Sequence, residues 1–168
     1  KYLDGQGRCL GGVVLGRAEL MAEVLGFLRS AGPTLSPFNA WVFTKGLETL
    51  RLRMEAHSAG ALALAQWLRE QPAVERVFYA GLPDHPGHEI ALRQMTGGFG
   101  GVLSIEVPGG RDRALAVAAR TQLFTRATSL GGVESLIEHR QSIEGPHSRT
   151  PPGLLRMSIG LEHVDDLI

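Results

Sequence analysis

Leu154-Leu155-Arg156-Met157-Ser158-Ile159-Gly160 is an apolar stretch interrupted by one guanidinium group, and it predicts a buried strand that carries a single charged side chain. A buried arginine needs an anionic partner, and its planar fork can bind a carboxylate through two parallel hydrogen bonds. From the residues alone, Arg156 is equally compatible with a structural ion pair and with a clamp for an anionic substrate.

The chain from Pro72 to this strand predicts a small sheet covered by helices. Short strands are expected over 74–79, 102–107, 124–128, 135–139 and 154–159, and helices over 89–95 and 111–123. This order is typical of an α+β domain. Residues 82–88 form a Pro/His/Gly loop. Residues 141–153, with three prolines, predict a solvent loop able to lie over a site.

Residues 1–71 predict one strand followed by three helices. Gly11 to Gly16 is a short apolar run bracketed by glycine, which is typical of a strand buried on both faces, and Lys1 lies on the loop before it. Apolar spacing predicts a helix over 17–30, and Ser36-Pro37 provides the start of a second helix through Leu47. A third helix is expected over 48–71, long enough at ~1.5 Å per residue to join two domains.

The composition indicates one ordinary domain, or the end of one domain joined to all of another. The 168 residues, of which 43% are hydrophobic, can bury a sizeable core. The 17 basic residues balance 17 acidic ones with no run of either sign, so nothing indicates a nucleic-acid or membrane partner. No run approaches the ~20 apolar residues that span a bilayer. We expect a neutral surface that handles small metabolites.

Cys9 is the single cysteine, so no disulfide can form within the chain. This usage fits a reducing cytoplasm. A catalytic thiol is one interpretation of Cys9. The favoured interpretation is a small apolar side chain on the approach to a buried strand, because buried free cysteines usually behave in that way.

Several further polar motifs are interpreted as structural. Gly97-Gly98-Phe99-Gly100-Gly101 lacks the Lys-Ser/Thr that follows a phosphate-binding loop, and it leads into a strand. His85-Pro86-Gly87-His88 has no nearby cysteine or carboxylate pair at ligand spacing, which favours a surface loop over a metal site. Glu134, Glu138 and His139 are expected to be hydrogen-bonding scaffold rather than acid–base groups.

Lys1 and Ser129-Leu130-Gly131-Gly132 are weak candidates when each is taken alone. Schiff-base chemistry needs an amine that is neutral at the moment of attack, which burial or nearby positive charge favours. Most lysines, however, are solvated surface charges. The Ser129 segment by itself is compatible with an ordinary serine-initiated turn.

Five stretches of the chain together resemble the Cys/Met-metabolism family of pyridoxal-phosphate enzymes, which includes cystathionine synthases and lyases and homoserine sulfhydrylases. They are residues 1–12, 36–54, 97–107, 129–139 and 154–167. Within the family, the chain is most similar to sulfhydrylases that use O-succinylhomoserine. Family members carry a large segment before the lysine that corresponds to Lys1, and usually some helix after the position of Ile168.

The resemblance implies an α/β protein of the fold-type-I, aspartate-aminotransferase-like class of pyridoxal-phosphate transferases. Residues 1–55 would form the end of the large cofactor-binding domain, and residues 56–168 the α+β carboxyl-terminal small domain. It also implies a homotetramer built as a dimer of dimers.

The resemblance also implies roles for four residues. Lys1 binds pyridoxal 5'-phosphate as a Schiff base and then moves a proton between Cα and Cβ of the substrate. Arg156 grips the α-carboxylate of the amino-acid substrate, and Ser129 helps to position both the lysine and that carboxylate. Thr128 stands where many cystathionine-forming or cystathionine-cleaving relatives have glutamate, so it is expected to favour sulfide as the nucleophile. No metal is expected.

The implied reaction is γ-replacement on O-succinylhomoserine, or another O-acylhomoserine, by sulfide, which gives homocysteine in methionine biosynthesis. A cystathionine γ-synthase or γ-lyase type of activity is an alternative. A non-catalytic fragment is another, because relatives take their phosphate-binding groups, the aromatic group stacked on the cofactor and the aspartate facing its pyridine nitrogen from upstream of the lysine.

Overall fold

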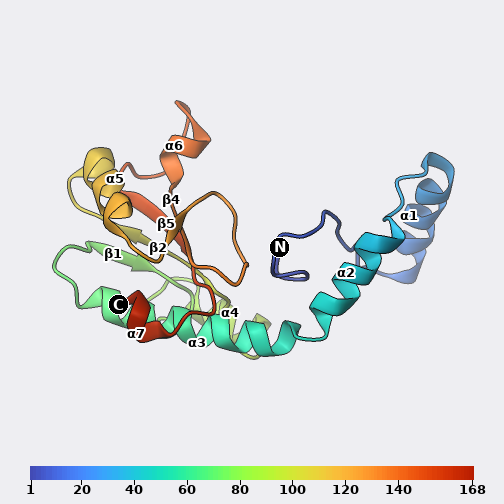
Figure 1. Ribbon diagram of the computed structural model, residues 1–168, viewed down its shortest axis with the longest axis horizontal. Helices are drawn as coiled ribbons and strands as arrows, with labels where there is room; N and C mark the ends of the chain where they lie inside the picture. The colour runs from blue at the N-terminus through green and yellow to red at the C-terminus, as the bar shows by residue number, and fades with distance from the viewer.

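The computed structural model describes residues 1–168, with a helix-covered sheet at one end and an extended arm at the other (Figure 1). The arm contains α1 (Ala18–Ala31) and α2 (Pro37–Leu47). The long helix α3 (Leu50–Arg69) begins beside the arm and runs along the sheet. No helix combines the length and the apolar character needed to cross a membrane.

The sheet has five strands in the order β1-β2-β5-β4-β3. Their bounds are β1 Arg76–Phe78, β2 Val102–Glu106, β3 Thr125–Arg126, β4 Leu136–His139 and β5 Leu154–Ser158. All neighbours are antiparallel except β3 and β4, which are parallel. The strand that carries Arg156, β5, is therefore the middle strand of the sheet. In the register, Arg156 lies between Ser104 of β2 and Glu138 of β4.

The hydrophobic core lies on one face of this sheet, between the strands and the helices α3 and α5 (Gly110–Arg120). Successive strand residues point to opposite faces. Because Leu155 and Met157 belong to the core, Arg156 between them points to the other face. The main core residues of α3, β2 and α5 are Ala61, Leu64, Ala65, Leu68, Leu103, Ile105, Ala114 and Ala118.

Most predicted elements are confirmed, and local signals explain why. α2 begins at Pro37, and the Ser36 side chain accepts a hydrogen bond from the backbone N–H of Asn39 at 3.2 Å, so this cap is the predicted one. The five strands and the helix α4 (His88–Gln94) lie within two residues of their expected positions. The predicted α+β order of residues after Pro72 is therefore correct.

The predicted buried strand over Gly11 to Gly16 is wrong. These residues form no strand and are exposed, with Leu15 at 85% and Val13 at 62% of their full accessible surface. A strand needs a neighbouring strand to satisfy its N–H and C=O groups, and none of the five strands pairs with this segment. The apolar composition predicted burial, but residues 1–168 provide no partner here.

Three smaller corrections concern helix bounds. The third helix begins at Leu50 rather than at 48, because Glu48 and Thr49 form a break after α2. The predicted loop over 141–153 begins inside a short helix, α6 (Arg140–Glu144), and a last helix, α7 (Val164–Leu167), was not predicted. The domain boundary after residue 55 falls inside α3 and stays a prediction.

Candidate functional site

Lys1 and Ser129, which are 128 positions apart in the sequence, meet in the structure. The Lys1 Nζ atom donates a hydrogen bond to Ser129 Oγ at 3.3 Å. Both residues line a cavity of about 440 Å³. The remaining lining residues are Asp4, Gly5, Gly7, Cys9, Leu10, Gly11, Phe43, Leu130, Gly132 and Glu134. The fold thus places the candidate lysine and the candidate turn on the two walls of one cavity.

Arg53 of α3 holds the backbone that carries Lys1. Its Nη1 atom donates to the carbonyl oxygen of Tyr2 at 2.8 Å, and its Nη2 atom donates to that of Gly46 at 2.8 Å. The side chain is buried, and burial lowers the pKa of Arg53, opposed by the Asp4 charge. The guanidinium thus connects the lysine segment to the end of α2 and to α3.

Sequence reasoning missed Arg53, although a signal was present. Arg53 and His57 precede the core residue Ala61 at intervals of four, so they lie on the buried face of α3. A charged residue on the buried face of a helix must have partners. That position alone marks Arg53 as an anchoring residue, but only the fold shows that its partner is the backbone beside Lys1.

Asp4 and Arg8 close the turn that follows Lys1. The Asp4 carboxylate is buried and accepts hydrogen bonds from the Arg8 backbone N–H at 2.7 Å and from Arg8 Nε at 2.8 Å. Burial alone would raise the pKa of Asp4, but the hydrogen bonds and the charge of Arg8 outweigh it and hold this pKa below its usual value. Gly5 has a φ of +73°, and any Cβ there would collide with the Arg53 guanidinium.

Arg156 and Ser158, alternate residues on the polar face of β5, both hold the turn that carries Ser129. Arg156 Nη2 donates to the carbonyl oxygens of Thr128 at 2.7 Å and Ser129 at 2.8 Å. Ser158 Oγ accepts from the backbone N–H of Gly131 at 2.9 Å. The two-residue period of the strand therefore positions the turn opposite Lys1.

Arg156 also has a carboxylate partner within the chain. Its Nε atom lies 2.9 Å from Glu138 Oε1, and the Glu138 side chain is 3% exposed. The Nε–H is not directed at that oxygen as a hydrogen bond, so the contact is an ion pair without good hydrogen-bond geometry. Arg140 Nη1 donates to the same oxygen at 3.0 Å. The structural ion pair is thus present, while Arg156 Nη1 has no hydrogen-bond or ion-pair partner.

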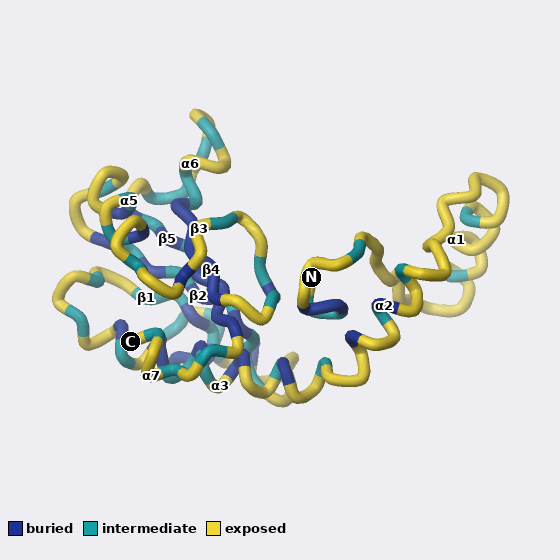
Figure 2. The backbone as a smooth tube through the Cα atoms, viewed as in Figure 1, coloured by how far each residue is buried: buried dark blue, intermediate teal, exposed yellow.

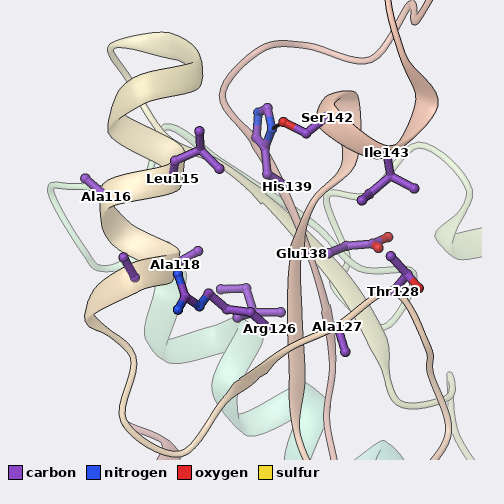
Figure 3. A pocket seen from close by; sticks show the side chains of 12 residues that line it. Leu115, Ala116, Ala118, Arg126, Ala127, Thr128, Glu138, His139, Ser142 and Ile143 are labelled. Atoms are coloured by element: carbon purple, nitrogen blue, oxygen red, sulfur yellow. Dashed lines mark hydrogen bonds between the residues drawn. The ribbon is translucent and has the colours of Figure 1, made fainter.

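Thr128 lines a different cavity from Lys1 and Ser129. This second cavity, of about 600 Å³, lies between α5, α6 and the strands β3 and β4 (Figure 3). Its walls are mainly apolar, and its polar lining includes Glu138, His139 and Ser142. Figure 3 shows the His139 ring against Ser142, where Nδ1 and Oγ are 2.6 Å apart. The neighbouring residues Thr128 and Ser129 therefore line different cavities.

The other candidate polar residues divide into structural ones and two that face the Lys1 cavity. Glu138 and His139 are scaffold as predicted, since Glu138 pairs with two arginines and His139 Nε2 lies 2.8 Å from the Pro152 carbonyl. Glu134 makes no side-chain hydrogen bond and lines the Lys1 cavity, so its scaffold interpretation is wrong. Cys9 is partly exposed at the same cavity, because the segment after it is not packed as a strand.

The glycine-rich and histidine-rich motifs make structural contacts. Ser58 Oγ accepts from the backbone N–H of Gly100 at 3.1 Å, and Tyr79 Oη donates to the Gly100 carbonyl at 2.8 Å. These contacts dock the glycine turn on α3. The His88 ring packs on Phe99 with centroids 5.5 Å apart, and its Nδ1 lies 2.7 Å from the Ala80 carbonyl. The loop interpretation of both motifs agrees with these contacts.

Comparison with known proteins is consistent along the whole chain. Residues 1–168 match the family described as Cys/Met metabolism PLP-dependent enzyme. The chain is 56% identical to O-succinylhomoserine sulfhydrylase of Pseudomonas aeruginosa, over 99% of its own length and 43% of that protein. It is 44% identical to cystathionine beta-lyase of Coxiella burnetii, over 99% of its length and 46% of that protein.

A solved structure agrees with these sequence matches. The cystathionine gamma synthase of Xanthomonas oryzae pv. oryzae, determined in complex with cystathionine, superimposes with a TM-score of 0.91 at 39% identity. It covers 99% of this chain, which in turn covers 45% of that structure. The fold is therefore that of the fold-type-I enzymes dependent on pyridoxal phosphate. Within that class, the chain belongs to the Cys/Met metabolism family, and it spans less than half the length of the relatives it matches.

The residues of the Lys1 cavity fit the end of pyridoxal phosphate that forms a Schiff base, but not its phosphate end. Lys1 has no carboxylate partner, its amine is held by a hydroxyl, and the cavity volume is within the roughly 300–1,000 Å³ usual for small-molecule sites. Lys1 is the only cationic residue that lines the cavity. The nearby Arg8 is paired with Asp4 and does not line this cavity. The residues that line this cavity thus include one amine of the kind that forms a Schiff base, and no second cationic group for the phosphate.

Proposed function

We propose that these residues form the lysine-bearing part of an enzyme that replaces the γ-substituent of O-succinylhomoserine, or another O-acylhomoserine, with sulfide to give homocysteine. The observation that carries the proposal is the contact between Lys1 Nζ and Ser129 Oγ across one cavity. The 56% identity to the O-succinylhomoserine sulfhydrylase of Pseudomonas aeruginosa supports this substrate pair over others. Such an enzyme would serve methionine biosynthesis.

Lys1 is the proposed holder of pyridoxal phosphate and the proposed proton carrier. When bound, this cofactor withdraws electrons from the substrate carbon next to the amino group. Lys1 Nζ then takes a proton from one carbon and gives it to the next. This transfer depends more on the position of the amine than on its strength as a base. The hydrogen bond to Ser129 Oγ supplies that position.

Arg156 is the proposed partner of the substrate α-carboxylate. Its Nη2 atom is already bound to two carbonyl oxygens and its Nε lies against Glu138, so Nη1 is the nitrogen available for a substrate oxygen. The Glu138 pair fixes the plane of the guanidinium, since Glu138 is buried and held by Arg140 as well. In this proposal the ion pair and the clamp are two functions of one side chain.

The remaining features of the proposal concern assembly and selectivity. The phosphate of the cofactor would be bound by residues other than those of the Lys1 cavity, as would its ring. We also propose a cytoplasmic homotetramer, with residues 1–55 belonging to the large domain and 56–168 to the small domain. Thr128, which brings no negative charge, would favour sulfide over an amino-acid nucleophile.

A cystathionine-forming activity is the second candidate. The structure with a TM-score of 0.91 is a cystathionine gamma synthase in complex with cystathionine, which favours this alternative. The two activities share the O-acylhomoserine substrate and differ in the nucleophile. A γ-lyase type of reaction and a non-catalytic fragment are the other outcomes to be tested.

One experiment separates these outcomes. The native protein, supplied with pyridoxal phosphate and O-succinylhomoserine, is offered sulfide and cysteine at equal concentration, and homocysteine, cystathionine and the 2-oxo acid of elimination are measured. Homocysteine as the main product supports the proposal. Cystathionine as the main product supports the cystathionine-forming activity instead, and the oxo acid supports a γ-lyase type of reaction. Lys1 and Lys45 are the chain's two lysines, so borohydride reduction and peptide mass mapping identify the attachment residue, with Lys45 as the internal control.

A further inference from the structure

Tyr2, next to the candidate lysine, packs against the body of the protein, which is the sheet with its covering helices α3 and α5. It does not pack against the arm. Its ring meets the ring of His57 in α3 edge to face, with centroids 5.4 Å apart. A Cβ built on Gly131 would lie 3.0 Å from the Tyr2 ring, closer than an ordinary contact, so the ring occupies the side of Gly131 where a side chain would begin. Tyr2 thus contacts the same turn that carries Ser129.

Together with the chain itself, these contacts connect four residues in a closed cycle. Lys1 Nζ binds Ser129 Oγ, Ser129 is followed two residues later by Gly131, Gly131 contacts the Tyr2 ring, and Tyr2 is bonded to Lys1. The backbone of Tyr2 is fixed independently, because its carbonyl oxygen accepts from Arg53 Nη1 at 2.8 Å. Because the backbone of Tyr2 is held, a shift of its ring against Gly131 displaces the Ser129 turn and so changes the distance between Lys1 and Ser129.

The phenol ring, and not its hydroxyl, makes the contacts. Tyr2 Oη is buried close to Gly101, yet it has no hydrogen bond of good geometry. Burial accordingly raises the pKa of Tyr2, opposed by the nearby Gly101 backbone. Gly131 has a φ of +74°, and its small size lets the ring approach the backbone directly. Removing the hydroxyl should therefore leave the contact intact, whereas removing the ring, or adding a methyl group at residue 131, should disrupt it.

We propose that Tyr2 is a positioning residue, whose ring, packed against Gly131 and His57, keeps the Lys1 amine at Ser129. The inference rests on the proposed role of Lys1 as the attachment point of pyridoxal phosphate. It does not depend on which acyl group leaves or which nucleophile adds. It assigns to Tyr2 no contact with substrate or cofactor.

Four variants of the intact native protein test this role. Tyr2→Ala removes the ring, and Tyr2→Phe removes only the unpartnered hydroxyl. Gly131→Ala pushes the ring from the other side. Gly32→Ala is the matched control for backbone strain, because Gly32 has nearly the same φ, +75°, but open space where a Cβ would be.

The first measurement is the initial rate at which borohydride fixes pyridoxal phosphate on Lys1, read by peptide mass across a range of pH. Tyr2→Ala and Gly131→Ala should lower this rate by on the order of ten- to a hundredfold and shift its pH midpoint, since misplacement by about 1 Å has effects of this size. Tyr2→Phe and Gly32→Ala should match the wild type. Equal rates in all four variants, or a Tyr2→Phe defect as large as that of Tyr2→Ala, would overturn the proposal.

The second measurement is amide hydrogen exchange over residues 129–132 without cofactor, together with the unfolding temperature. Tyr2→Ala should speed exchange in this turn while exchange in β2 stays as in the wild type. If Tyr2→Ala does not fold, the comparison of Gly131→Ala with Gly32→Ala decides the matter alone. A wild-type protein in which pyridoxal phosphate never attaches to Lys1 would refute the proposed function, whereas unchanged exchange in both ring-displacing variants would refute the role of Tyr2.

Discussion

The outer helix of the arm, α1, and the helix α3 of the body follow the same helix rules but differ strongly in burial. Helix α1 has no buried residue, although apolar residues recur along it at helical spacing, and Phe27 is 68% exposed. In α3 the same kind of spacing buries Leu64 to 1%. Figure 2 shows this contrast as an almost entirely exposed arm beside a buried sheet. An amphipathic pattern thus predicts that a helix forms and which side is apolar, but not what covers that side.

Lys1 lies where the arm meets the body, and its removal should have the largest effect. Lys1→Ala in the native enzyme should lower turnover by at least about 10³-fold, because proton transfer by a positioned group contributes roughly 10² to 10⁴ and the attachment point is lost as well. The measurement is steady-state turnover with O-succinylhomoserine and sulfide. Lys45→Ala, on the exposed face of α2, should leave turnover unchanged. Near-normal activity of Lys1→Ala would refute the assignment.

The contrast in burial can be measured directly with a pair of leucines. Leu64→Ala should destabilise the chain of residues 1–168 by roughly 3 to 5 kcal/mol, because the side chain is enclosed in the core. Leu25→Ala in α1, where the residue is 45% exposed, should cost less than about 1 kcal/mol. Denaturant unfolding followed by circular dichroism gives both values. Equal losses would contradict the distinction between arm and body.

Substitution of Arg156 tests whether this residue of β5 only stabilises the body or also binds a substrate. Arg156→Lys should lower kcat/KM by roughly ten- to a hundredfold, since a point charge cannot hold the two carbonyls and a carboxylate together, and a hydrogen bond to a charged group is worth about 1.5 to 3 kcal/mol. Much of the loss should be in KM, with the cofactor still bound. A wild-type KM combined with a lower unfolding temperature would show that Arg156 is only the ion-pair partner of Glu138.

Asp4 should make the stability of the segment after Lys1, where the arm meets the body, depend on pH. Its pKa in the folded protein is below the ordinary value of 3.8, so its contribution to stability is present above that value and is lost as the pH falls through the folded pKa. Thermal unfolding between about pH 5 and about pH 2 should show a steeper acid loss in the wild type than in Asp4→Asn. If the two curves are parallel, the Asp4–Arg8 contact does not make the stability of this segment depend on pH.

Thr128, which lines a different cavity from Ser129, should give the smallest effect. Thr128→Glu should shift the ratio of sulfide to cysteine use by a few-fold towards cysteine, because a carboxylate can pair with an incoming ammonium group at roughly 0.2 to 1 kcal/mol for an exposed pair. Product ratios from competing nucleophiles report this directly. An unchanged ratio would fit the position of Thr128 in the separate cavity beside Glu138.

Sequence patterns predicted elements well where the deciding contacts are local. The start of α2 follows from Ser36, Pro37 and Asn39, all within one turn. The strand at 154–158 follows from a short apolar stretch interrupted only by Arg156 and Ser158. The prediction failed at Gly11 to Gly16, because a strand is stable only beside another strand, and no local pattern contains that neighbour.

By itself the sequence determined the family and the order of strands and helices after Pro72, and it predicted Lys1, Ser129 and Arg156 as one group of site residues. Only the tertiary structure decided how they meet: Lys1 at Ser129, Arg53 on the Tyr2 carbonyl, Glu138 beside Arg156, and the Tyr2 ring on Gly131. The physical reason is distance along the chain. Propensity and spacing reflect contacts within about four residues, whereas the site depends on contacts between residues 128 positions apart, as Lys1 and Ser129 are, or 129 positions apart (131 − 2), as Tyr2 and Gly131 are.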